Sequence, residues 1–199
     1  ADMSDPAQIA DLVAATEKRF GQVDIVVNNA GIQTVAPIEE FPADRYNLIL
    51  AINMSAAWHL CRATFGGMKE RGWGRVINVA SAHGLVASPY KSAYVMAKHA
   101  VVGLTKTLAL EGAEHGITAN AICPGYVLTP LVEKQIPETA KARGITEDAV
   151  IRDVLLAAQP TKTFVQPGQI GALAAFLCTS AASQITGTAL PVDGGWTAH

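Results

Sequence analysis

The chain has 199 residues, of which 50% are hydrophobic and 16% are charged, and its formal net charge is −2. This length and apolar content suffice for one domain with a sizeable core, and the small net charge argues against a nucleic-acid or anionic-membrane partner. With no eighteen-residue apolar run, no signal-peptide pattern and three irregularly spaced cysteines, we expect a cytoplasmic protein with reduced thiols and no metal site.

The predicted elements alternate between helices and strands along the chain. In chain order they are a helix over residues 6 to about 20 that Ser4-Asp5-Pro6 caps, a strand over 23–28, a helix over 42–67, a strand over 74–81, a helix over 92–115, a strand over 117–123, a helix over 167–179 and a strand over 189–192. Continuous apolar strands such as VDIVV and RVINVA are typical of a parallel sheet that is buried on both faces. The pattern predicts an α/β fold with a doubly wound parallel sheet in three layers, whose ligands bind at the carboxyl ends of the strands.

Two stretches depart from this alternation. Residues 128 to about 160 form an irregular, charge-bearing connection longer than a normal loop, so we predict a substrate lid there. The chain also opens at Ala1-Asp2 without the first strand, glycine-rich turn and second strand of a doubly wound nucleotide-binding sheet. We therefore expect residues 1–199 to be a single domain lacking its first βαβ portion.

Ser81, Tyr94 and Lys98 form the pattern that indicates chemistry. Ser81 closes a predicted buried strand, while Tyr94 and Lys98 are four residues apart on the next helix and share one face of it. An ammonium group about 4 Å from a phenol favours the phenolate, so Lys98 is expected to lower the pKa of Tyr94 toward neutrality. Such a tyrosine is a usable acid/base near pH 7. The three residues therefore predict an oxidoreductase that interconverts an alcohol and a ketone.

Further motifs strengthen this interpretation, because a Tyr-x-x-x-Lys pair taken alone also occurs on exposed helix faces. They are Asn28-Asn29-Ala30-Gly31 after a strand, Asn53 on the next helix, Pro124-Gly125 after a later strand and Val192-Asp193-Gly194-Gly195 near the end. With these motifs, essentially the whole chain resembles the short-chain dehydrogenase/reductase family. The resemblance implies a Rossmann-like domain that binds a nicotinamide cofactor. In that family, the first βαβ portion, which this chain lacks, is the part that separates NAD from NADP.

The resemblance also implies roles for individual residues. The expected catalytic residues are Asn53, Ser81, Tyr94 and Lys98. In these roles Tyr94 exchanges a proton with the substrate oxygen, Ser81 hydrogen-bonds that oxygen, Lys98 also holds the nicotinamide ribose, and Asn53 helps to hold a water. Asn53 alternatively satisfies backbone groups of its helix. The residues expected to contact NAD are Asp2, Met3, Asn29, Ala30, Gly31, Tyr94, Lys98, Pro124, Gly125, Val127 and Thr129.

Four segments narrow the resemblance: GIQTVAPIEEF, ASAHGLVASPYKSAYVMAKHAVVGLTK, AICPGYVLTPLVEKQI and VDGGW. They are most similar to family members that oxidise D-3-hydroxybutyrate to acetoacetate with NAD. This likeness implies a small anionic 3-hydroxy acid substrate, bound by Gln33, Ser81, His83, Lys91, Tyr94 and Gln135. Taken alone, Lys91 or Gln135 is more typical of an ordinary exposed side chain, and the co-occurrence of the group favours binding. Tyr126 and Trp196 are expected to form pocket walls.

The resemblance further implies a homotetramer. Small side chains on the predicted Tyr94 helix, at Ala97, Ala100, Val101 and Gly103, would allow close packing between subunits.

Two classes of function remain open. The first is a working dehydrogenase, and the second is a shortened, inactive relative that serves as a binding or assembly subunit. The intact set of catalytic residues favours the dehydrogenase.

Overall fold

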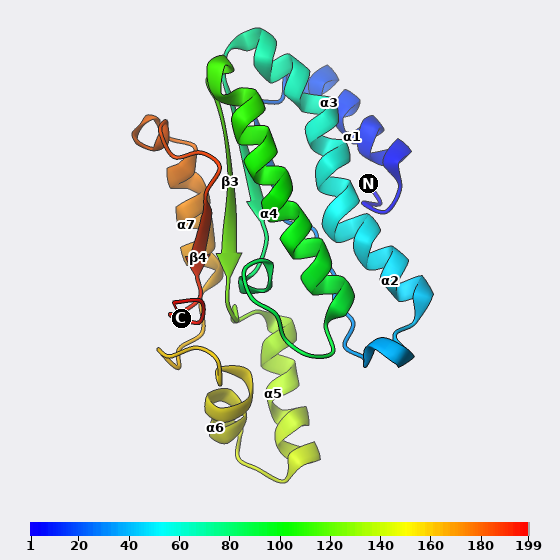
Figure 1. Ribbon diagram of the computed structural model, residues 1–199, viewed down its shortest axis with the longest axis vertical. Coiled ribbons are helices and arrows are strands. Elements are labelled where there is room, and N and C mark those ends of the chain that lie inside the picture. Colours follow the sequence, from blue (N-terminus) through cyan, green and yellow to red (C-terminus); the bar gives the residue numbers. More distant parts are fainter. Residues whose placement is uncertain (199) are drawn as a thin grey trace.

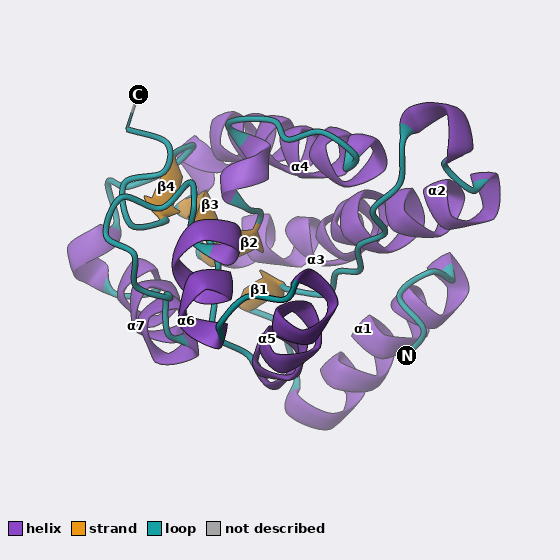
Figure 2. Cartoon of the chain, turned by 90° about the horizontal axis from the view of Figure 1, so that it is seen from below, coloured by secondary structure: helices purple, strands orange, loops and turns teal. Residues whose placement is uncertain are grey.

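Four parallel strands form the centre of the computed structural model, which describes residues 1–198 apart from the side chain of Leu131. They lie side by side in chain order as β1 (Ile25–Asn28), β2 (Gly74–Val79), β3 (Ile117–Pro124) and β4 (Ala189–Val192) (Figures 1 and 2). The register opposes Val26 to Val76, and Asn78 to Ala121. All the strands therefore end at one edge of the sheet, which brings together the loops that follow them. The predicted parallel α/β sheet is confirmed.

Helices cover both faces of this sheet. One face is covered by α1 (Pro6–Phe20), α3 (Ala56–Arg71) with α2 (Ala43–Leu50) before it, and α4 (Ser92–Gly112). The other face is covered by α7 (Pro167–Leu177). Beyond the carboxyl ends of the strands lie α5 (Pro130–Arg143) and α6 (Glu147–Ala149) (Figures 1 and 2). Successive side chains of β2 point to opposite faces, because strands have a period of two. Val76 packs against Phe65 of α3, whereas Ile77 packs against Leu177 of α7.

The helix predicted over 42–67 is present but is longer than expected. The remaining short segments are π-helical at Ala51–Ser55 and Val150–Leu155, and 3₁₀-helical at Ile38–Glu40, Ala82–Gly84, Ala113–His115 and Ser180–Ala182. Because α2, the first π-helical segment and α3 follow one another directly, the helical stretch runs from Ala43 to Arg71. The predicted end at Gly67 is wrong, since the left-handed residue that stops the helix is Gly72, with φ +68°.

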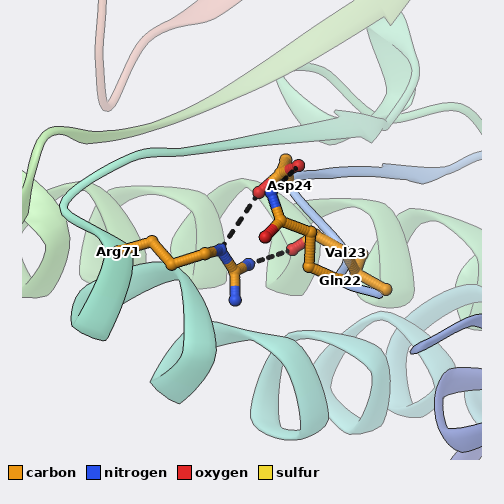
Figure 3. Close-up of polar contacts among 4 residues, drawn as sticks. All are labelled: Gln22, Val23, Asp24 and Arg71. Carbon is orange, nitrogen blue, oxygen red and sulfur yellow. Dashed lines mark hydrogen bonds and ion pairs between the residues drawn. The ribbon is translucent and has the colours of Figure 1, made fainter. Parts of the chain in front are cut away.

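Arg71 ties the end of α3 to the entry of β1. Its Nε lies 3.1 Å from Oδ1 of Asp24, and its Nη2 donates a hydrogen bond of 2.6 Å to the carbonyl oxygen of Val23 (Figure 3). The side-chain amide of Gln22 also donates to Asp24, at 2.8 Å. The strand begins at Ile25 rather than at 23, because the Val23 carbonyl is bound by this arginine instead of a neighbouring strand.

Burial on both faces, which the sequence predicted for the strands, holds for β3 but not for β1. Every residue of β3 is buried. In β1 only Val26 is buried, while Ile25 and Val27 are 45% and 49% exposed. Their side chains alternate with Val26 and so point away from α3, to the face where α7 covers β2 and β3 instead. Burial on both faces is therefore not found for β1, because no helix of the described chain covers its second face.

The connection over 128–160 is helical, as predicted. It contains α5, α6 and the second π-helical segment, and these lie across the carboxyl ends of the strands (Figure 2). Its far end is packed into the body of the domain, because Val150, Leu156 and Gln159 are fully buried. The lid function stays a prediction.

Helix α4 buries part of the surface that the sequence predicted for subunit packing. Ala97 and Val101 are 0% and 3% exposed and lie in the core of their own chain. That part of the prediction is wrong, because these two residues face the sheet and α2 rather than solvent; Ala100 and Gly103 remain accessible. Among residues 1–198, no helix combines the length and the apolar character that crossing a membrane requires.

Candidate active site

Ser81 stands just beyond the carboxyl end of β2, where the chain turns toward α4. The predicted strand over 74–81 ends at Val79, because Ser81 begins a 3₁₀ turn and its Oγ accepts a hydrogen bond of 3.1 Å from the backbone N–H of His83. The turn packs directly on α4. A Cβ placed on Gly84 would lie 2.9 Å from the carbonyl oxygen of Lys98, so the absence of a side chain permits this contact. Ser81 is thereby held beside the first turn of α4.

Tyr94 faces Ser81 from that first turn, but its pKa differs from the expectation. Burial raises the pKa of Tyr94 above its ordinary value, and a side-chain hydrogen bond with Ser81 opposes this effect only in part. The expected lowering by Lys98 is therefore wrong for this structure. The physical reason is that desolvation of the phenolate is the largest effect, whereas Lys98, whose Nζ is 5.6 Å from the centre of the Tyr94 ring, is not among the groups that lower its pKa.

Lys98 is 4% exposed and lies between the ends of β2 and β3. Its Nζ donates a hydrogen bond of 2.8 Å to the carbonyl oxygen of Val79. Burial lowers the pKa of Lys98 to about 8, although the nearby thiol of Cys123 acts in the opposite direction. The amine is therefore mostly protonated at neutral pH, although its pKa lies only slightly above neutrality. A lowered pKa of this kind is typical of functional lysines.

Asn53 lies in the π-helical segment between α2 and α3 and is 3% exposed. Its Oδ1 accepts from the N–H of Ile32 and its Nδ2 donates to the carbonyl oxygen of Ile32, both at 2.9 Å. The alternative role in satisfying backbone groups is thus present, although the backbone belongs to the loop after β1 rather than to its own helix. Gly31 adjoins this clamp, since a Cβ there would lie 3.8 Å from Oδ1 of Asn53 and 3.7 Å from Nζ of Lys98.

Several of the residues predicted to bind the cofactor share one cavity of about 220 Å³. Its lining includes Met3, Asn29, Ala30, Asn53 and Lys98. Asp2 stands next to it, with Oδ1 bound to the N–H and hydroxyl of Ser4 at 2.8 and 2.7 Å. The absence of a side chain at Gly31 leaves the backbone beside this cavity accessible, which fits a ligand that passes close to it.

The other predicted cofactor residues follow β3 and do not line that cavity. The N–H of Gly125 donates to the carbonyl of Val192 at 3.0 Å, Val127 pairs with Val165, and Thr129 caps α5 through its hydroxyl. Pro124 ends β3 itself. The structure thus places these four residues at the same edge of the sheet as Ser81, but as a separate group.

Aromatic rings and Lys91 gather beside Tyr94. The ring of His83 is 5.9 Å from that of Tyr94 and 4.9 Å from that of Trp196, both edge to face. Trp196 in turn stacks on Tyr126 at 5.8 Å, and Nζ of Lys91 is 5.7 Å from the Tyr126 ring. The predicted pocket walls and two of the predicted carboxylate ligands therefore form one cluster.

His83 and Lys91 differ in their electrostatics. Burial and, to a smaller extent, the positive charge of Lys91 together lower the pKa of His83 to about 4, so the imidazole is neutral at physiological pH. One ring nitrogen, Nε2, is 2.9 Å from the hydroxyl of Ser88. Burial also lowers the pKa of Lys91. Lys91 is thus the charged group of the cluster and His83 is a neutral hydrogen-bonding group.

Gln33 and Gln135 are not joined to this cluster by any described contact. Both side chains are exposed, and neither takes part in a hydrogen bond among the described residues. Gln33 lies in the loop after β1, and Gln135 lies on α5. Their expected role in binding the substrate stays a prediction.

Three residues to which the sequence analysis assigned no individual role support the site. Asp193 accepts from the N–H of Gly195 and from the N–H and hydroxyl of Thr197, which holds the turn that carries Trp196. Gln159 is fully buried and accepts from the N–H of Tyr126 at 2.6 Å. Ser88 bonds His83. The Asp-Gly-Gly sequence could have indicated the first, because aspartate commonly caps such turns; no local pattern marks the other two.

Nothing in the described part of the chain resembles a metal centre, since no three His, Cys, Asp or Glu side chains come together there. Cys61 and Cys123 are buried free thiols, and Cys178 is a half-buried one.

Comparison with known proteins gives concordant results. A family model described as enoyl-(acyl carrier protein) reductase matches residues 1–197. The chain is 59% identical to the D-beta-hydroxybutyrate dehydrogenase of Rhizobium meliloti and 54% identical to that of Cupriavidus necator, over its whole length and 77% of theirs. Among solved structures, it is similar to a gluconate 5-dehydrogenase from Burkholderia cenocepacia in complex with NADP and tartrate, with a TM-score of 0.88 and 32% identity over 100% of this chain and 74% of that one.

Proposed function

The chain belongs to the short-chain dehydrogenase/reductase family, and from this premise we propose that it transfers hydride between D-3-hydroxybutyrate and NAD, with acetoacetate as the oxidised product. One observation supports the proposal most. Ser81, Tyr94 and Lys98 converge at the end of β2, with His83 and Lys91 beside them. The first three suit proton exchange at an alcohol or ketone oxygen, and the last two suit a carboxylate nearby.

Substrate binding in this proposal divides between charge and shape. Lys91 supplies the positive charge for the carboxylate, because the pKa of His83 leaves that ring neutral. His83 offers its second ring nitrogen as a hydrogen-bonding group, with its orientation set by Ser88. The stacked rings of Tyr126 and Trp196 form an apolar wall that excludes water from the pair. Gln33 and Gln135 would join when the 128–160 lid closes on the substrate.

Proton transfer is assigned to Tyr94. In the reductive direction its phenol donates the proton to the ketone oxygen of acetoacetate, while Ser81 hydrogen-bonds the same oxygen. In the oxidative direction the phenolate takes the proton of the substrate hydroxyl. Because burial raises the pKa of Tyr94, the phenol form predominates at neutral pH, so oxidation is expected to accelerate and reduction to slow as the pH rises.

The residues that would hold NAD are those around the 220 Å³ cavity, namely Met3, Asn29, Ala30 and Lys98, with Gly31 next to it. Asp2, Pro124, Gly125, Val127 and Thr129 are proposed for the ends of the same cofactor, and Asn53 for a water beside it. Bound NAD would supply the hydride acceptor. Lys98, which keeps its charge at neutral pH, would hold the ribose hydroxyls of the cofactor.

A substrate comparison tests the proposal. The native protein is assayed with D-3-hydroxybutyrate and with 4-hydroxypentan-2-one, which has a methyl ketone in place of the carboxylate. Lys91→Met should lower kcat/KM for the acid by about 10- to 150-fold, because a charge-assisted hydrogen bond is lost, and should leave the neutral substrate nearly unaffected. Lys106→Met, at an exposed position of α4, is the matched control. An equal loss on both substrates would contradict the carboxylate assignment.

The same assay separates the remaining alternatives. Parallel measurements with NAD and NADP test the cofactor, for which the related gluconate 5-dehydrogenase structure contains NADP. Absence of turnover on any hydroxy acid, with cofactor binding retained in calorimetry, would instead support the inactive binding or assembly subunit. Sedimentation analysis tests the proposed homotetramer, for which the exposed Trp58 and Leu110 of α3 and α4 offer apolar contact surface.

A further inference from the structure

A second cavity lies at the opposite edge of the sheet from Ser81 and Tyr94. It is formed at the amino ends of β2 and β3, near the ends of α3 and α4 at the top of Figure 1, and its volume is about 470 Å³. Its lining comes from the turns before these two strands and from the segment between α7 and β4. The lining includes Arg75, Thr118, Cys178, Ser180, Ser183 and Thr186.

Arg75 places a buried positive charge in this cavity. The residue is 4% exposed, its Nη1 donates to the carbonyl oxygens of Gly74 and Gly116 at 2.7 and 3.1 Å, and its guanidinium carbon lies 4.5 Å from the centre of the Trp73 ring. Its Nε is buried without a hydrogen-bond partner. Among the described residues, the ion pairs involve other arginines and none involves Arg75. The cation is thus held by one nitrogen and by an aromatic ring, with its Nε–Nη2 edge unbound.

Thr118 adds a second unpartnered group next to it. The register of the sheet places Thr118 directly opposite Arg75, so both side chains point to the same face. Thr118 is also 4% exposed, and its Oγ1 is buried without a partner. Ser180, Ser183 and Thr186 are exposed residues of the same lining, which contains no Asp or Glu. The hydroxyl of Thr186 accepts a hydrogen bond of 3.1 Å from the N–H of Ala119.

We propose that this cavity binds the oxyanion of a small metabolite, a carboxylate or a phosphate, through Arg75 and Thr118. A buried donor without a partner destabilises a fold by about as much as its desolvation, so two adjacent ones favour a ligand that pairs with both. The Nε–Nη2 edge of a guanidinium matches two oxygens of a carboxylate or phosphate, and a threonine hydroxyl can donate to the same group. The site is separate from the proposed catalytic function and requires neither its cofactor nor its substrate.

Calorimetry and labelling of the native protein test the proposal together. Inorganic phosphate and, separately, succinate are titrated against chloride at equal ionic strength, which distinguishes the phosphate from the carboxylate source. We expect saturable 1:1 binding of at least one of them. N-ethylmaleimide labelling of Cys178, which is the half-buried thiol in this lining, should slow in parallel, whereas Cys61 and Cys123 are buried elsewhere. Binding that leaves the labelling of Cys178 unchanged overturns the assignment.

Thr118→Val gives the decisive variant, because it keeps the shape of the side chain and removes only the hydroxyl. The affinity for the anion should fall about tenfold or more, while the melting temperature without anion should stay the same or rise, since no buried hydroxyl is left unpaired. Thr107→Val, on an exposed face of α4, is the matched control and should bind as the wild type does. Arg75→Met should abolish binding. Absence of saturable binding in the wild type, or unchanged affinity in Thr118→Val, overturns the proposal.

Discussion

The two edges of the sheet use polar side chains in different ways. At the carboxyl edge, Lys98 and His83 are groups that can change protonation, and burial lowers their pKa values to about 8 and about 4. At the amino edge, the exposed Arg71 and the buried Arg75 bind backbone carbonyl oxygens through their guanidinium groups. One edge therefore concentrates groups that exchange protons, and the other concentrates groups that keep a fixed charge.

The backbone differs between the edges as well. At the amino edge the turns before β2 and β3 touch directly, because a Cβ on Gly116 would meet the carbonyl oxygen of Gly72. At the carboxyl edge the contacts run between side chains and loops, such as the clamp of Asn53 on Ile32. From this difference we expect substitutions at the carboxyl edge to alter turnover and substitutions at the amino edge to alter the stability of the fold. The predictions below test this division.

The largest expected effect is that of Tyr94→Phe at the carboxyl edge. Loss of the titrating hydroxyl should lower kcat by about 10²- to 10⁴-fold, because general acid–base catalysis is typically worth that much. The melting temperature should change little, since the ring and its packing are retained. Steady-state kinetics and thermal unfolding measure the two effects. A loss of turnover below about tenfold would show that another group carries the proton.

The convergence of Ser81, Tyr94 and Lys98 was accessible from the sequence, because strand order and helix spacing decide which residues meet. The pKa of Tyr94 was not accessible, since it depends on how much solvent reaches the phenol and on where Lys98 points. For the same reason Gln33 and Gln135 were named as ligands but lie exposed in the structure. Spacing determines the neighbourhood of a side chain, whereas burial and rotamer require the packed fold.

The elements of the fold were predicted well except where tertiary contacts set their limits. Helix α3 ends at Arg71 and not at the predicted Gly67, because helix packing tolerates the Gly66-Gly67 pair and Gly72 supplies the left-handed turn. The outward face of β1 could not be derived from its apolar sequence, since exposure depends on which helix covers the strand. The π-helical segment at Ala51–Ser55 has no sequence signature, although it carries Asn53.

An intermediate effect is expected for His83 when the pH falls. Its pKa is about 4 in the folded protein against an ordinary 6.5, so between these values the unfolded state binds more protons and stability decreases on acidification. The loss should approach roughly 3 kcal/mol by pH 4 and should be absent above pH 6.5. Urea unfolding across this range should show a flatter dependence for His83→Gln than for the wild type, with His115→Gln at an exposed site as the control. An identical slope in both variants would place the acid sensitivity elsewhere.

The smallest expected effect is that of Arg71→Met at the amino edge. The variant loses the hydrogen bond to Val23 and the partly exposed ion pair with Asp24, which together are worth roughly 1 to 2 kcal/mol. Asp24→Asn removes only the ion pair, so its cost should be below about 1 kcal/mol, and the difference isolates the contact with the backbone. Urea unfolding measures both losses. Because this contact lies at the far end of β1 from Gly31 and Lys98, kcat/KM should stay within about twofold of the wild type. A parallel fall in kcat/KM would mean that the entry of β1 positions the catalytic edge, and the division between the two edges would then fail.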